Sequence, residues 1–206
     1  NMLPNSGRLY FFYEIDKSPW GEANQKAGWQ VVYIEDESIP LHRINHPASQ
    51  GEYYEIQALS SFKLSYAELW TVSIVDEIWM TLATSTPMHE DPTAIKYQEI
   101  VDAIEQHAPL HYMLGNAFDL QRDSRKVSQF GANGCIYGTK DYDKNYEILE
   151  AGIKDWILLF QMESDRDWKH NFHLMFGRSG SVYFMIREKD LLTKNFANTW
   201  LVQQSQ

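Results

Sequence analysis

Histidines and a single cysteine are the side chains in this sequence best suited to catalysis or metal binding. His42 and His46 are four residues apart, as are His107 and His111, and this spacing places two ligands on one face of a helix. Prolines interrupt both stretches, however, and a zinc site needs further ligands that one cysteine does not supply. Cys135 lies in a glycine-rich stretch, where a thiol beside a base would be a nucleophile, but no base is near it in the sequence. We therefore expect no metal, no cofactor and no catalytic residue.

Carboxylates form clusters that could do other chemistry. Paired carboxylates can hydrolyse glycosides or hold a cation, but the spacing of a calcium-binding loop is absent. One cluster ends in a tryptophan, and acids beside an aromatic ring are typical of a surface on which a basic protein docks. The alternative is that these clusters are solvated loops. The predicted partner-binding residues are Glu163, Asp165, Asp167, Trp168, Asp141 and Asp143.

The net charge of −10 narrows the class of partner. An acidic domain is repelled by nucleic acid and by anionic membranes, so we expect neither as a partner, and a basic protein is the expected one. One cysteine permits no intramolecular disulfide and fits a reducing compartment. The sequence contains neither an apolar run of about 18 residues nor a signal-peptide pattern near Asn1. We therefore expect a cytoplasmic protein.

Alternating and continuous apolar runs predict the strands that must position these groups. Residues 8–15 alternate, and residues 29–35 follow a turn-rich stretch, so the two runs read as an antiparallel pair. Further strands are expected within residues 153–165, where an apolar run extends from Trp156 to Phe160, after Ser179, and at the end of the chain. Between the earlier and later strands, residues 93–108 have the pattern of an amphipathic helix. Residues 118–148 contain several glycines and read as a loop-rich region.

Two segments of the chain repeat one pattern. Residues 6–35 and 179–204 both open with Ser-Gly, one residue, an aliphatic side chain and Tyr-Phe, and both close on Trp-x-Val. Because a lone strand pair is marginal in water, two such units would share one core. We predict a single α+β domain over residues 1–206, mainly antiparallel sheet. Its similar half-units, 1–90 and 110–206, would be joined by a central amphipathic helix near 93–108.

The chain resembles the YwqG-like family, a bacterial domain of unknown function. The resemblance rests on LPNSGRLYFFYE and WQVVYIE in the first half, and on DWILLFQMESD and the last segment, from Gly177 to Gln204. It implies an α+β fold with two related halves. The family carries a strand before each Gly-x-x-Tyr-Phe unit, and here the first unit begins only a few residues from Asn1. Either the chain is shortened or the missing strand leaves an edge for something else to cover.

The resemblance also implies a function. YwqG-like proteins are similar, in their acidity and lack of catalytic motifs, to small cytosolic immunity proteins encoded beside bacterial toxins. We expect a non-enzymatic protein that neutralises a cognate, basic toxin by direct binding. Replacing Asp165 and Asp167 by lysine should then slow association with the toxin without unfolding the protein. The alternatives are a hydrolase or transferase, or a small-molecule sensor, with its site in a cleft between the two halves. The oligomeric state stays open.

Overall fold

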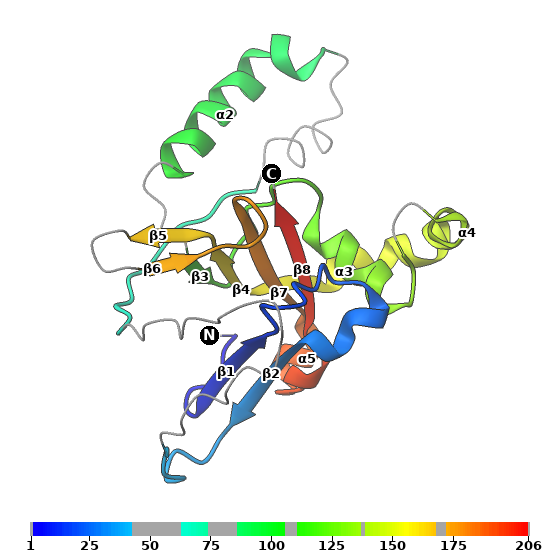
Figure 1. Cartoon of the computed structure of the whole chain (residues 1–206). Helices are drawn as coiled ribbons and strands as arrows, with labels where there is room; N and C mark the ends of the chain where they lie inside the picture. The colour runs from blue at the N-terminus through cyan, green and yellow to red at the C-terminus, as the bar shows by residue number, and fades with distance from the viewer. Residues whose placement is uncertain are drawn as a thin grey trace.

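A four-stranded antiparallel sheet forms the centre of the computed structural model (Figure 1). The structure describes residues 2–42, 63–73, 86–105, 111–136, 139–167 and 172–205. The order in the sheet is β3-β4-β7-β8, so consecutive strands along the sheet are not all consecutive in sequence. The strands are β3 (His111–Met113), β4 (Trp156–Glu163), β7 (Gly180–Arg187) and β8 (Trp200–Ser205).

Strand β7 is covered on both faces, which explains its continuous apolar sequence. Every residue from Gly180 to Ile186 is buried. Phe184 faces Phe11 from the first strand pair, with ring centroids 5.2 Å apart. On the opposite face, the Tyr183 hydroxyl donates a hydrogen bond to the Phe118 carbonyl oxygen, 2.6 Å away. The predicted strand is confirmed, and burial on both faces accounts for its lack of alternation.

The first strand pair packs on one face of this sheet. Strand β1 (Arg8–Tyr13) pairs antiparallel with β2 (Trp29–Ile34), and the short 3-10 helix η1 (Ala23–Gly28) lies between them. Trp29 meets Trp200 edge to face at 5.2 Å. The indoles of Trp29 and Trp200 donate hydrogen bonds to the Thr199 and Gly21 carbonyl oxygens respectively, so each ring is fixed as well as buried.

A bulge in β4 directs neighbouring side chains to opposite layers. The pairing of β4 with β7 shifts between Leu158 and Phe160. Leu158 therefore lies on the side of the helices, whereas Phe160 contacts Phe11 at 4.8 Å on the side of the strand pair. One strand thereby supplies both the core under β1–β2 and the floor of a cavity on the other face.

Helices α3 (Ser124–Ala132) and α4 (Lys140–Leu149) lie on the other side of the sheet (Figure 1). The prediction of a loop-rich region there was wrong. Gly131 reads as a turn glycine in the sequence but lies inside α3. The position requires glycine because a Cβ there would come within 2.8 Å of the Trp200 indole nitrogen. Asp123 begins the helix by accepting hydrogen bonds from the Arg125 and Lys126 amides.

The predicted helix near residues 93–108 is present as α2 (Pro92–Glu105). Asp91 caps it, because its carboxylate accepts hydrogen bonds from the Thr93 and Ala94 amides. The pattern predicts one apolar face with Ile95, Ile100 and Ile104 and with Val101 beside them. Val101 is buried, as is Ala94, whereas Ile95 and Ile100 are about half exposed, so the predicted face was only partly right. The remaining elements are η2 (Met88–Glu90), η3 (Glu150–Asp155), β5 (Asp165–Asp167), β6 (Phe172–Leu174), α5 (Glu188–Leu192) and η4 (Phe196–Asn198).

The mixed α+β class with antiparallel sheets is confirmed, and the duplication stays a prediction. Both predicted units are antiparallel pairs, but β1–β2 and β7–β8 lie in different sheets. Their registers also differ, because Tyr13 lies opposite Trp29 while Met185 lies opposite Trp200. Within the described residues, β1 pairs with β2 alone.

None of the helices in the described part of the chain has the length and hydrophobicity to cross a bilayer.

Candidate functional site

The predicted partner-binding residues fall in two places rather than one. Asp141 and Asp143 lie in the first turn of α4, while Glu163 and Asp165 lie where β4 passes into β5. Figure 1 shows α4 and β5 at opposite ends of the molecule. Asp167 ends β5, and Trp168 lies outside the described residues. The six residues therefore do not form one continuous patch.

The carboxylates near β5 are engaged with the protein itself. Glu163 accepts a hydrogen bond of 3.1 Å from the Gln161 side-chain amide, and burial raises the pKa of its carboxyl above 4.5, the ordinary value. Asp165 lies 3.8 Å from the His111 imidazole, and both side chains are about one-third exposed. These acids are less available to a partner than the sequence suggested.

The exposed side of α4 is the more open acidic surface. Tyr142 turns inward and stacks on Phe130 with ring centroids 4.3 Å apart, so the opposite side of the helix faces water. We call this exposed side the α4 face. It carries Asp141, Asp143, Glu147 and Ile148 together with two exposed lysines, of which Lys144 lies 3.7 Å from Asp141. Ile148 is 74% exposed, which leaves a large apolar side chain on a helix whose other exposed residues are charged.

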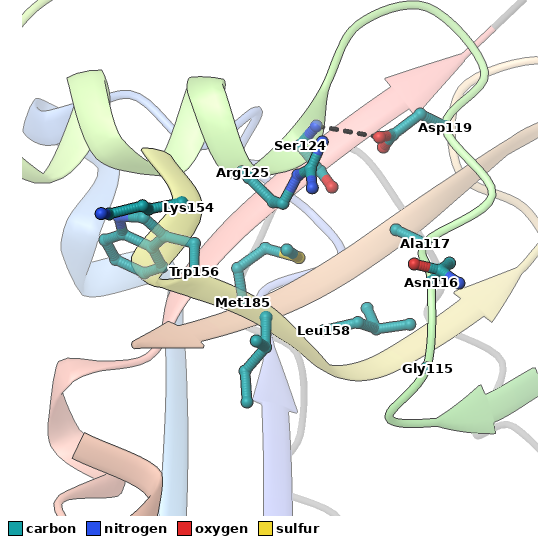
Figure 2. Close-up of a pocket in the computed structure, with 11 residues that line it drawn as sticks. Gly115, Asn116, Ala117, Asp119, Ser124, Arg125, Lys154, Trp156, Leu158 and Met185 are labelled. Carbon is teal, nitrogen blue, oxygen red and sulfur yellow. Dashed lines mark hydrogen bonds between the residues drawn. The ribbon is translucent and has the colours of Figure 1, made fainter. Parts of the chain in front are cut away.

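A small polar cavity lies on the helix side of the sheet and was not predicted. It measures about 170 Å³ and opens beside the N-terminal end of α3. In Figure 2, Asp119 stands at one end, Trp156 and Lys154 stand at the other, and Arg125 lies between them. Leu158 and Met185 form an apolar floor. We call this the Asp119 pocket.

Two glutamines hold the loop that carries Asp119. The Gln161 side-chain oxygen accepts hydrogen bonds from the Tyr112 hydroxyl and the Phe118 amide, both at 2.9 Å. The Gln204 side-chain oxygen accepts one of 2.8 Å from the Gln121 amide. Gln161 belongs to β4 and Gln204 to β8, so these two strands fix the loop on both sides of Asp119.

The Asp119 carboxyl is a perturbed acid. Burial raises its pKa from 3.8 to about 7, and nearby Asp123 adds to the rise. Hydrogen bonding from Ser124, whose amide donates to Asp119 over 3.1 Å, and from the Gln204 amide opposes it. At neutral pH this carboxyl is thus poised between its neutral and charged forms. A perturbed acid in a cavity is a candidate functional group with a physical cause.

Arg125 is the positively charged group on the wall of the pocket. Its guanidinium binds the Asp123 carboxylate through two nitrogens, each 3.1 Å from an oxygen. Burial lowers the pKa of the Arg125 guanidinium, which stays charged because arginine is not deprotonated in proteins. The two-point contact fixes the plane of the guanidinium at the wall of the pocket.

The sequence offered only an indirect signal for this pocket. Asp119 lies in the stretch that read as a loop. Gln161 and Gln204, however, both belong to the segments on which the family resemblance rests, and both are buried at 0% and 2% exposure. Buried amides need hydrogen-bond partners, so these glutamines pointed to a polar segment held against the sheet.

The histidine and cysteine candidates show no catalytic arrangement in the part of the chain that is described. Cys135 is buried against Phe130 and Tyr142, as expected for an inert thiol. His42 is exposed, and its neighbour His46 lies outside the described residues, as does His107, the partner of His111.

The fold and the site define an α+β domain with an acidic helix face and a small cavity that carries a perturbed acid. The chain belongs to the family described as "Domain of unknown function (DUF1963)", whose model matches residues 1–204. No curated protein matches the chain.

Proposed function

We propose that this chain is a non-enzymatic binding protein that neutralises a basic protein, in the manner of a cytosolic immunity protein paired with a bacterial toxin. The resemblance to YwqG-like bacterial proteins belongs to the same proposal. The observation that supports it best is the α4 face, where the exposed side chain of Ile148 lies on the same helix as the exposed carboxylates of Asp141, Asp143 and Glu147 and two exposed lysines. An apolar centre within a charged rim is the composition of a protein-binding surface.

The charge of the whole chain favours a basic partner. The chain has 28 acidic against 18 basic side chains, which leaves a net charge of −10. Near α4, exposed Glu150 and Asp155 extend the acidic surface into η3, with lysines at 140, 144 and 154 among them. Such a field would steer a basic protein toward this end of the molecule and would weaken in salt.

The alternative functions place a site in a cleft between the two halves. The Asp119 pocket is lined by residues 115–185, so it lies within the second half-unit rather than between the two. It supports binding of a small molecule, which is independent of the proposed protein partner.

Charge reversal on the α4 face tests the proposal. The tagged chain is captured from its native host at about 50 mM and about 500 mM salt, since screening separates steered from apolar contacts. We expect a stoichiometric basic protein at low salt, less of it at high salt, and at least tenfold less with Asp141→Lys plus Asp143→Lys. Both positions are exposed, but they lie in the first turn of α4, where lysine is less favourable than aspartate, so circular dichroism checks that the helix is kept.

The matched comparison is Asp165→Lys plus Asp167→Lys at the opposite end of the molecule. If the partner binds the α4 face, this second pair will reduce capture less than the first. A greater loss from the second pair would move the surface to β5. A captured protein that is acidic, or that both pairs leave fully bound, would contradict docking by charge.

A further inference from the structure

The Asp119 pocket has opposite charges on its walls and an apolar floor. Asp119 is the acid, and Arg125 supplies the positive charge, with Lys154 at the far end (Figure 2). Leu158 and Met185 are 2% and 0% exposed in the floor. A ligand with one charge only would satisfy one wall and lie close to a like charge on the other.

Both charged groups are held in place before any ligand arrives. The Ser124 amide donates to one Asp119 oxygen at 3.1 Å, and the Gln204 side-chain amide approaches the other at 3.5 Å. Asp123 holds the Arg125 guanidinium by the two contacts described above. Groups that are fixed in advance lose little entropy on binding, so a small ligand can gain from them.

The size of the cavity limits the ligand. Its volume of about 170 Å³ has room for a molecule with a short aliphatic group and two small charged ends.

We propose that the Asp119 pocket binds a small aliphatic α-amino acid, with its ammonium on Asp119, its carboxylate on Arg125 and its side chain on the floor of Leu158 and Met185. Burial leaves the Asp119 carboxyl with a raised pKa in the empty pocket, and a ligand ammonium supplies the counter-charge that it lacks. This site is separate from the α4 face and does not depend on the proposed protein partner.

Three probes of nearly the same shape test this proposal by calorimetry at pH 8, where Asp119 is ionised. They are L-valine, isovalerate, which lacks the ammonium, and isobutylamine, which lacks the carboxylate. We expect L-valine to bind with a Kd below about 1 mM and each analogue to bind at least tenfold more weakly, because isovalerate brings no ammonium to Asp119 and isobutylamine brings no carboxylate to Arg125. Amide NMR shifts on L-valine addition should centre on Ala117, Leu158 and Met185.

Variants separate a pocket effect from a general one. Asp119→Asn should weaken L-valine binding at least tenfold, whereas Asp155→Asn, at an exposed carboxylate, should leave it unchanged. An absence of L-valine binding to the wild-type chain at about 10 mM, well above that Kd, would overturn the proposal. Equal binding of either analogue would also overturn it, since a single charge would then be enough.

Discussion

Replacing Gly21 by alanine is expected to lower the free energy of unfolding by about 3 kcal/mol, which combines backbone strain with overpacking. Gly21 has a φ of +100°, which side-chain-bearing residues rarely adopt. A Cβ there would also overlap the Leu201 carbonyl oxygen in β8, and backbone cannot move aside as a side chain can. The same loop covers the edge of β8, because the Gln203 amide donates to the Trp20 carbonyl oxygen at 3.3 Å. Urea unfolding measures the loss.

Gly134 provides the matched control for this substitution. It has a φ of +81°, but a Cβ there meets nothing within 4 Å. Gly134→Ala should therefore cost only the backbone strain, about 1 kcal/mol. Equal losses at the two positions would show that the contact of the loop with β8 is not as close as described.

Replacing Asp119 by asparagine is expected to change how stability depends on pH. The folded-state pKa of about 7 exceeds the ordinary 3.8, so the folded protein keeps a proton that the unfolded chain releases. The stabilisation from this proton is complete below about pH 4 and is lost as the pH rises through 7. Asp119→Asn removes the titrating group, so relative to wild type it should gain about 2–4 kcal/mol between pH 4.5 and pH 8.5.

The pH dependence is the decisive measurement for this variant, rather than its stability at one pH. The contact from Gln204 is weakened in the asparagine variant at every pH, which shifts the whole curve by about 1 kcal/mol without tilting it. Asp155→Asn, at an exposed carboxylate, should follow the wild-type curve. If Asp119→Asn also ran parallel to wild type, the carboxyl would not be buried as the structure places it.

The strands were predictable because the order of apolar and polar residues within each strand reflects which of its faces are buried. Alternation in residues 8–15 and the apolar run that begins at Trp156 each report how a strand is covered, without knowledge of its neighbours. Helix α3 was missed because Gly131 is required by its close contact with the Trp200 indole, which is distant in sequence, and not by a local turn. A glycine required by close packing looks the same in sequence as a glycine required by a turn.

The Asp119 pocket could not be predicted for a similar reason. The groups that raise or restrain the Asp119 pKa come partly from β8, 85 residues further along the chain, as the Gln204 contact shows. The acidic clusters were visible in the sequence, but their exposure was not. Glu163 turned out to be partly buried, whereas Asp141 and Asp143 face water on α4.

The central claim is that binding through the acidic surface neutralises a basic protein, and a titration tests it most directly. The purified chain is added to its captured partner while the activity of that partner is followed. We predict that the activity of the partner falls in proportion to the added chain and reaches its minimum near equimolar amounts. Salt should restore this activity, and a chain with both Asp141→Lys and Asp143→Lys should not lower it. Full activity of the partner in the presence of excess bound chain would contradict the account.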